Sequence, residues 1–252
     1  MKDSRRKQME ALVARQKSAT MEELRQAFGV SMNTVRSDVA YLVRTGAVEK
    51  IYGGVRAVQH QQVPLFTQRT ELRAEVKRAI ARQAERLVED NDIIFIDAGT
   101  TTMHLIDFLD PVKHVTVITG NLYVVAQAYH KPNVELIVLP GSMNRRTNSV
   151  ADVSTLEFLG RYHYGKAFMG VSGISPDGKL NVSTYIEYEL KKLAVRQSQR
   201  AFLLADAGKF GGSSLMSYGV LSDMEGVITD AQWPQEAWEY CREHGVKVTA
   251  AE

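Results

Sequence analysis

The sequence is poor in several features that define particular classes of protein. It contains one cysteine, Cys241, and six prolines among 252 residues. A single cysteine excludes a disulfide framework and a zinc site built on paired cysteines. The longest run without charge or histidine, residues 115–129, contains Thr, Gly, Asn and Gln, so it is too short and too polar to span a membrane. The N-terminus lacks the apolar segment of a secretory signal, and we expect a cytoplasmic protein without a membrane segment.

Sequence motifs for metal binding and hydrolysis are missing as well. Ser172, Ser213 and Ser214 have no evident general base as a partner, so hydrolysis is unsupported. The histidines lack the spacing of metal ligands; they are His60, His104, His114, His130, His163 and His244. We therefore expect neither a metal nor a cofactor.

Charge divides the chain into two unequal parts. Its length predicts two domains, and its 44% hydrophobic content is enough to bury a sizeable core. Residues 1–60 hold eleven Lys and Arg against six Asp and Glu, whereas the remainder holds 20 against 23. A basic segment joined to a mildly acidic one suggests that the basic segment binds a polyanion.

Three helices are predicted before residue 45. The first covers residues 2–17, and a capping box at Thr20 and Glu23 begins the second, residues 21–28, which ends at Gly29. Ser31 caps the third helix. By its 3.6-residue period, this helix turns Val35, Val39 and Leu42 inward and Asn33, Arg36, Ser37, Ala40 and Arg44 outward.

A hairpin is predicted after these helices, because residues 48–58 alternate in polarity around Gly53 and Gly54. Three helices and a hairpin form a winged helix-turn-helix, whose third helix enters the major groove of DNA. Lys50, Tyr52 and Arg56 would then reach phosphates or the minor groove. The alternative is a three-helix bundle that binds a protein.

From Arg6 to about Val58 the chain resembles the DNA-binding domain of the DeoR family of bacterial transcriptional regulators. The resemblance rests on Glu23-Leu24, Phe28-Gly-Val-Ser31, Thr34-Val-Arg36, Asp38, Leu42, Gly46 and Tyr52-Gly-Gly54. It implies that Ser31 and Thr34 hold DNA phosphates, while Asn33 and Arg36 reach base edges, Arg36 as a bidentate partner of guanine. The family usually has arginine where this chain has Ser37, which affects operator sequence or affinity.

The rest of the chain alternates short apolar runs with helical patterns, which predicts a parallel sheet covered on both faces. The expected domains are residues 1–59, a linker over 60–69, and an α/β domain over 70–252. Strands are expected at residues 93–96, 115–119, 134–139, 167–171, 201–205 and 227–229. Helices are expected at residues 70–88, 102–109, 122–129, 184–198 and 234–244.

Small, hydroxyl-rich loops follow several of these strands. Residues 97–102, Asp-Ala-Gly-Thr-Thr-Thr, lie between a strand and a helix, a pattern typical of an anion site. A similar loop occurs at residues 119–121, Arg145 and Arg146 lie in a long loop, and residues 206–211 place Lys209 at the same edge of the sheet. Such turns also occur without a ligand, and paired arginines also form solvated patches or bind a partner subunit.

These loops extend the resemblance to the DeoR sensor domain, which is similar in fold to sugar-phosphate isomerases and senses phosphorylated sugars or related metabolites. The resemblance implies an effector site made by Asp97, Gly99, Thr100 and Thr101, faced by Asn121, Glu187 and Lys209. The chain departs from the family at Leu139-Pro-Gly141, which replaces the common Gly-Gly pair, and at Thr119-Gly-Asn121.

An aldose-ketose isomerase is the alternative class, because Glu187 and Lys209 could supply a base and an electrophile. The Asp-Gly-Ala-Asp stretch of such isomerases is absent, and Asp177-Gly178 reads as a turn. We therefore expect binding without turnover. The sequence predicts a homo-oligomeric repressor that binds double-stranded operator DNA under the control of a phosphorylated sugar.

Overall fold

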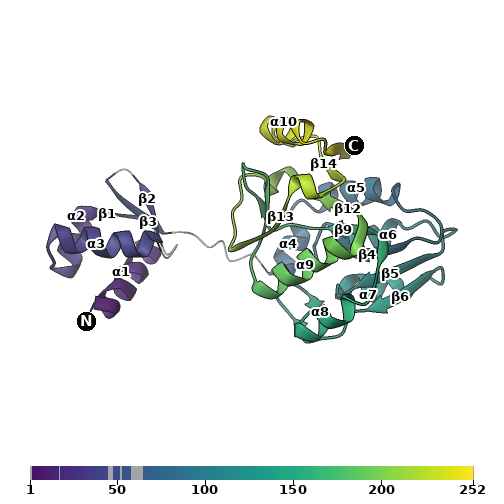
Figure 1. The fold of residues 1–252 in the computed structure, drawn as a ribbon, viewed down its shortest axis with the longest axis horizontal. Helices are drawn as coiled ribbons and strands as arrows, with labels where there is room; N and C mark the ends of the chain where they lie inside the picture. Colours follow the sequence, from purple (N-terminus) through teal and green to yellow (C-terminus); the bar gives the residue numbers. More distant parts are fainter. Residues whose placement is uncertain (1, 17, 45–47, 52, 58–64, 252) are drawn as a thin grey trace. The chain divides into compact units, whose positions relative to one another are not determined.

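The computed structural model describes residues 2–16, 18–44, 48–51, 53–57 and 65–251. The chain forms two compact units, Met1–Gln62 and Val63–Glu252, each with its own hydrophobic core (Figure 1). Within the described ranges, no helix is both long enough and apolar enough to cross a membrane.

The N-terminal unit contains three helices and a small sheet. The helices are α1 (Lys2–Gln16), α2 (Met21–Phe28) and α3 (Met32–Arg44). The predicted hairpin is present as β2 (Val48–Ile51) and β3 (Gly54–Ala57), and β1 (Ser18–Thr20) adds a third strand beside β3. The sequence did not reveal β1, because a three-residue strand has no measurable alternation.

Local chemistry sets the helix ends of this unit as predicted. The Thr20 hydroxyl accepts from the Glu23 amide at 3.2 Å, and the Glu23 carboxylate accepts from the Thr20 amide at 2.7 Å. Gly29 closes α2 with a φ of 60°, a backbone region that side chains disfavour. The Ser31 hydroxyl then accepts from the Thr34 amide at 3.3 Å. The helix-turn-helix arrangement is therefore fixed by caps on both sides of the turn.

The two faces of α3 separate as the helical period predicts. Val35, Val39 and Leu42 are buried in the core of the unit, with Met9 and Leu24 from the other helices. Asp38 is also fully buried and binds two arginines of α1: Arg5 Nε and Arg6 Nε each donate to its carboxylate at 2.8 Å. This ion-pair cluster joins α1 to α3.

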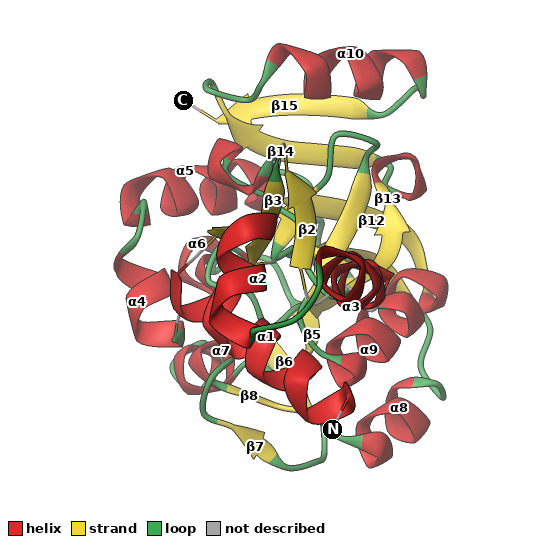
Figure 2. Ribbon diagram, turned by 90° about the vertical axis from the view of Figure 1, so that its left-hand side faces the viewer, coloured by secondary structure: helices red, strands yellow, loops and turns green. Residues whose placement is uncertain are grey.

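The C-terminal unit is built on a seven-stranded parallel sheet, as predicted. Its strand order is β15-β14-β12-β9-β4-β5-β6. The strands are β4 (Ile93–Ile96), β5 (Val115–Thr119), β6 (Val134–Val138), β9 (Tyr164–Met169), β12 (Ser198–Leu204), β14 (Gly226–Asp230) and β15 (Lys247–Ala251). The edge strand β15 was not predicted, because its sequence is short and mixed; Figure 2 shows it between β14 and α10.

Helices cover both faces of the sheet, which explains why β4 (Ile93–Ile96) is apolar at every position. Ile94 and Ile96 face one core and Phe95 faces the other. One face is covered by α5 (Ala74–Glu85), α6 (Leu105–Phe108, after the 3-10 turn Thr102–His104) and α7 (Leu122–Ala128). The other is covered by α8 (Val153–Leu159), α9 (Tyr185–Gln197) and α10 (Gln235–Glu243).

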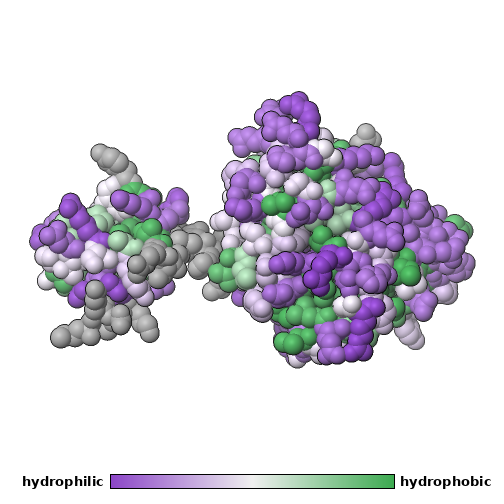
Figure 3. All heavy atoms as spheres, in the orientation of Figure 1, coloured by the Kyte–Doolittle hydropathy of each residue, from purple (hydrophilic) through white to green (hydrophobic). Residues whose placement is uncertain are grey.

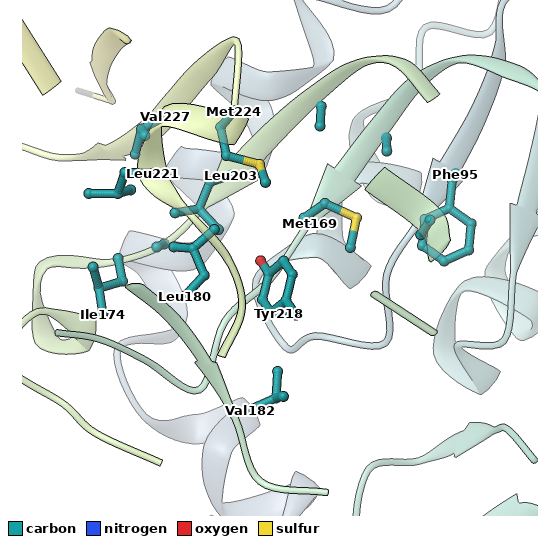
Figure 4. Close-up of a cluster of buried hydrophobic side chains, with 14 of the residues drawn as sticks. Phe95, Met169, Ile174, Leu180, Val182, Leu203, Tyr218, Leu221, Met224 and Val227 are labelled. Carbon is teal, nitrogen blue, oxygen red and sulfur yellow. The ribbon is translucent and has the colours of Figure 1, made fainter. Parts of the chain in front are cut away.

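A second, antiparallel sheet packs against the core that contains Phe95. It contains β10 (Gly173–Ile174), β11 (Lys179–Val182) and β13 (Met216–Val220). A separate two-stranded ribbon consists of β7 (Met143–Asn144) and β8 (Ser149–Val150). Figure 4 shows Tyr218 of β13 among Leu180, Val182 and Met169. Its hydroxyl donates to Gly170 O at 3.1 Å, so β13 is tied to the loop that follows β9.

The helix predicted over residues 70–88 is wrong in its bounds. The structure has two helices, α4 (Phe66–Glu71) and α5, and α4 begins inside the stretch predicted as linker. The break is Arg73, whose φ of 54° ends one helix and precedes the next. Apolar periodicity continues across this residue, because Leu72 and Val76 are four apart, so the pattern alone could not show the break.

Candidate functional site

Five of the predicted DNA-contacting residues lie on the first turns of α3 or directly before it. Ser31, Asn33, Arg36 and Ser37 are exposed, and Thr34 is half-buried with its hydroxyl 3.0 Å from that of Ser31. On the hairpin, Lys50 is exposed, and Arg56 forms an ion pair with Glu49 at 2.7 Å. Tyr52, predicted to contact DNA, lies outside the described residues.

A groove runs between α3 and the hairpin and brings two of the predicted cations together. Its volume is about 550 Å³. Its lining consists of Met21, Arg36, Val39, Ala40, Val43, Lys50, Ile51, Gly53 and Gly54. In the described part of the unit, neither Arg36 nor Lys50 forms an ion pair with an acidic side chain. The helix and the hairpin therefore present positive charge to the same side, as a reader of the major groove requires.

In the C-terminal unit, the predicted anion loop follows β4 at the carboxyl edge of the sheet. The Thr102 hydroxyl donates to Asp97 O at 2.8 Å and accepts from the Gly99 amide at 3.1 Å. Thr100 and Thr101 are buried, with 4% and 5% of their surface exposed. The loop is thus held in one conformation by its own hydroxyl groups, at the start of a helical turn.

Asn121, which the resemblance places facing the effector, lies behind this loop and is fully buried. Its side-chain nitrogen donates to Asp97 O at 3.3 Å and Gly99 O at 3.4 Å, while its oxygen accepts from the Tyr123 amide at 3.0 Å. Both ends of the amide are used within the protein. In this arrangement Asn121 positions the loop, and it also caps α7.

The glycine before Asn121, unusual for the family, has a structural reason. A side chain at Gly120 would place a Cβ 2.5 Å from Val150 O, and the Val150 amide donates to Gly120 O at 2.8 Å. Residue 120 therefore packs directly against β8. This contact connects the second loop of the site to the β7–β8 ribbon.

The carboxylate of Asp97 has a partner that the sequence did not suggest. Asp97 is 2% exposed, accepts from the Gly170 amide at 2.9 Å, and forms an ion pair with Lys191 of α9. Lys191 Nζ also donates to Gly170 O at 2.9 Å. Lys191 lies one helical turn after Glu187, so the i, i+4 spacing on α9 could have identified it as a second residue on the same face.

Further basic residues lie around Lys209, and the sequence analysis missed them too. Burial lowers the pKa of Lys209, and the nearby charges of Arg69 and Lys191 lower it further against the opposing effect of Asp206. Burial also lowers the pKa of Lys77 to about 8, and the charge of Lys209 adds to this effect. Arg69 of α4, Lys77 of α5, Lys191 and Lys209 thus form a cation cluster. The carboxylates of Asp97, Asp206 and Glu187 lie among these groups and offset part of their positive charge, and a bound anion would offset more.

Glu187 lies beside this cluster and is half-buried. Its carboxylate accepts from the Thr184 hydroxyl at 3.0 Å. Glu187 lines a cavity of about 30 Å³ together with Asp97, Lys191, Ser149 and Ala151. This volume holds about one water molecule, whereas pockets for small ligands are about 300–1,000 Å³. A sugar phosphate is therefore larger than this cavity.

Metal ligands do not gather in this unit. Across the described ranges of the chain, no group of three or more His, Cys, Asp or Glu side chains could hold a metal ion. The polar groups of the site are backbone amides, hydroxyls, ammonium groups and carboxylates, a set that suits a phosphate ester with hydroxyl groups.

A winged helix-turn-helix unit joined to an α/β unit with an anion-type site defines a ligand-controlled transcription regulator. Comparison with known proteins agrees: a DeoR-like helix-turn-helix domain matches residues 5–61, and a DeoR C terminal sensor domain matches residues 72–231. The chain belongs to the DeoR family of transcriptional regulators. It is a DNA-binding regulator and not an enzyme.

Three relatives that match this chain over at least 93% of its length are named as transcriptional regulators. It is 36% identical over 251 residues to the HTH-type transcriptional regulator IolR of Bacillus subtilis, covering 100% of both chains. It is 27% identical to the glycerol-3-phosphate regulon repressor of Escherichia coli, covering 94% of each. It is 28% identical to the L-fucose operon activator of Haemophilus influenzae, covering 93% of this chain and 94% of that one.

Solved structures show a more distant likeness. Ribose 5-phosphate isomerase A from Neisseria gonorrhoeae has a TM-score of 0.41 and 16% identity, covering 56% of this chain and 55% of that one. Translation initiation factor eIF-2B from Pyrococcus horikoshii has a TM-score of 0.43 and 15% identity, covering 88% and 81%. Scores this low support no statement about function.

Proposed function

We propose that this regulator represses a carbohydrate-utilisation operon and that a phosphorylated sugar, bound at the carboxyl edge of the parallel sheet, controls its binding to operator DNA. The observation that carries the proposal is the cation cluster beside the Asp97–Thr102 loop. A phosphate dianion would add negative charge beside four basic side chains, of which Lys191 is already paired with Asp97, and loop amides at the start of a helical turn would donate hydrogen bonds to its oxygens.

The proposed contacts follow from this geometry. Asp97, Gly99, Thr100, Thr101, Glu187 and Lys209 would contact the effector, and Asn121 would hold the loop. Ser31 and Thr34 would contact DNA phosphates, Asn33 and Arg36 would reach base edges, and Lys50 and Tyr52 would reach phosphates or the minor groove. Ser37 would also belong to the DNA-binding surface. The domains would be residues 1–59 and 70–252, joined by residues 60–69, of which the last four are helical.

Two further properties complete the proposal. The protein would act in the cytoplasm, where operator DNA is found. It would act as a homo-oligomer, because two helix-turn-helix units related by two-fold symmetry match two half-sites one DNA turn apart. Sedimentation of the full chain at micromolar concentration tests this property, and a monomer would contradict it.

The DNA-binding part of the proposal is tested with Arg36→Ala. Loss of one bidentate guanine contact should reduce the preference for operator over scrambled DNA by about 1–3 kcal/mol. Lys50→Ala is the matched control, because loss of a phosphate contact weakens binding to both DNAs alike. Gel retardation with DNA from upstream of its own gene measures both. Equal affinity of the unaltered protein for the two DNAs would contradict specific readout.

The effector part is tested by a thermal-shift screen of phosphorylated sugars, with each neutral sugar as its control. A ligand at a hundred times its Kd stabilises the unit that binds it by about 2.7 kcal/mol. We expect stabilisation by at least one phosphate ester and none by its neutral sugar. Incubation with pentose and hexose phosphates should yield no isomerised product.

A further inference from the structure

The segment that follows residue 64 is tied to three loops at the carboxyl edge of the sheet. At its start, the Phe66 amide donates to Arg146 O, in the β7–β8 loop, at 3.1 Å. At its corner, Arg73 Nη1 donates to Asp206 at 2.9 Å and Nη2 donates to Gln232 Oε1 at 3.0 Å. At its end, buried Lys77 donates to Arg69 O. These contacts join α4 and α5 to the loops that surround the effector site.

Arg73 makes two of these contacts, and its backbone conformation is unusual. Its φ of 54° lies in the left-handed region, which side chains other than glycine seldom adopt. Such a conformation persists where surrounding contacts enforce it, and it is concentrated at ligand clamps and switch regions. Here the enforcing contacts are those of the guanidinium group with Asp206, Gln232 and, at 3.3 Å, Asp230.

The same carboxylates hold the loop that carries Lys209. Asp206 accepts from the Gly208 amide at 3.0 Å as well as from Arg73, and Asp230 accepts from the Ala207 amide at 2.9 Å. Asp206 is 4% exposed. The guanidinium group of Arg73 therefore connects the Lys209 loop to the corner between α4 and α5. The position of the corner depends on that of the loop, and the reverse is also true.

We propose that Arg73 is a positioning residue that couples the Lys209 loop to α4, so that an anion bound at the cation cluster changes DNA affinity through the segment leading to the N-terminal unit. This inference rests on the proposed function. An anion shared by Arg69 of α4 and Lys209 draws helix and loop together, and the Arg73 fork makes the helix corner follow the loop. Because coupling is reciprocal, operator DNA must change the affinity for the anion by the same factor.

The experiment measures the Kd of inorganic phosphate for the full chain with and without a saturating operator duplex, at constant ionic strength. The variant is Arg73→Gly, because glycine accepts the left-handed backbone while the guanidinium group is lost. The matched control is Arg82→Ala, an exposed arginine on α5 that contacts the Phe108 ring and neither carboxylate. Circular dichroism verifies that each variant is folded.

For the unaltered chain and for Arg82→Ala, we expect the two Kd values to differ at least about fivefold. For Arg73→Gly, we expect a ratio near one and a phosphate Kd for the free protein within about threefold of the unaltered value. Arg73→Lys retains the charge without the two-pronged guanidinium group, so its ratio of Kd values should fall between these limits. If the glycine variant does not fold, a full ratio in Arg73→Lys would overturn the proposal.

Three results would overturn the proposal. If Arg73→Gly keeps the full ratio, Arg73 does not couple the two sites. If it loses phosphate binding tenfold or more while folded, Arg73 is a direct ligand. If the unaltered chain binds phosphate equally with and without DNA, the site is not coupled at all. A complete lack of phosphate binding by the unaltered chain would instead refute the proposed function itself.

Discussion

At the scale of single residues, the ammonium group of Lys191 forms an ion pair with the carboxylate of Asp97, which is buried. Both Lys191 and the Gly170 amide contact the Asp97 carboxylate. Removal of one member of a buried pair leaves the other uncompensated, which costs far more than the pair itself contributes.

Lys191→Met should therefore lower the free energy of unfolding of the C-terminal unit by about 3–5 kcal/mol, measured by urea titration. Lys192→Met is the matched control, because Lys192 is exposed on the same helix, and it should change stability little. The double variant Asp97→Asn and Lys191→Met should recover part of the loss. Equal stability of the two single lysine variants would show that the pair is not buried in solution.

Lys77 gives the site a dependence on pH. Burial lowers the pKa of Lys77 to about 8, and the charges of Lys209, Arg69 and Arg73 add to this effect against the opposing charge of Asp206. Below pH 8 Lys77 is charged in the folded and unfolded protein alike. Between pH 8 and its usual range the folded protein loses this proton first, so the electrostatic cost of burying the charge disappears and stability rises.

Phosphate binding should show the opposite dependence on pH. As Lys77 becomes neutral, the cation cluster loses charge, and affinity for inorganic phosphate should fall above pH 8 by up to about tenfold per pH unit. Calorimetric titration between pH 7.5 and 9.5 measures this change. In Lys77→Gln the decline should be shallower, since the lowered pKa of Lys209 leaves a remainder. An identical decline in both proteins would exclude a contribution from Lys77.

At the scale of elements, α1 and α3 depend on one buried carboxylate. Burial alone would raise the pKa of Asp38, but hydrogen bonds from Arg5 and Arg6 outweigh it, and the net pKa is lowered. A carboxyl group with a lowered pKa stabilises the folded state above its unfolded pKa, and this contribution is lost as the pH falls through the folded value. The N-terminal unit should therefore lose stability below about pH 4.

Asp38→Asn should remove the same contribution at neutral pH. Hydrogen bonds to charged groups contribute about 1.5–3 kcal/mol, so the N-terminal unit should be destabilised by an amount in this range. Glu22→Gln, which alters an exposed carboxylate paired with Arg25, is the control and should have little effect. Equal effects of the two changes would mean that the Arg5–Asp38–Arg6 cluster does not join the helices.

The same elements show how far the sequence determines the structure. The caps at Thr20, Gly29 and Ser31 act within four residues, so their pattern predicts α2 and α3 correctly. Six of the seven strands of the parallel sheet contain runs of apolar residues and were recognised from them, whereas the mixed sequence of β15 was not. Arg73 and Lys191 were missed, because their partners lie 133 and 94 residues away in the chain and no local pattern records such contacts.

At the scale of the whole molecule, two compact units that share no hydrophobic core imply two unfolding events. Trp233 and Trp238 are the two tryptophans of the chain, and both lie in the C-terminal unit. Tryptophan fluorescence therefore reports the C-terminal unit, while far-ultraviolet circular dichroism reports both units. The visible face of the C-terminal unit is mostly polar, with small scattered apolar patches (Figure 3).

On heating, these two signals should give different midpoints for the same sample. Added phosphate at a hundred times its Kd should move the fluorescence midpoint upward, by the equivalent of about 2.7 kcal/mol, and leave the other transition in place. Operator DNA should move the transition that fluorescence does not report. Coincident midpoints that shift together with either ligand would show that the units unfold as one.

If the cation cluster binds a phosphate ester as proposed, it also determines which cellular event the regulator responds to. An uncharged sugar that has just entered offers four basic side chains nothing to neutralise, and it would leave the cluster as it was. Only after a phosphorylating enzyme has acted does the molecule acquire the required charge. The gene switch would then follow the cell's commitment to consume a nutrient, and the mere presence of that nutrient outside would pass without a response.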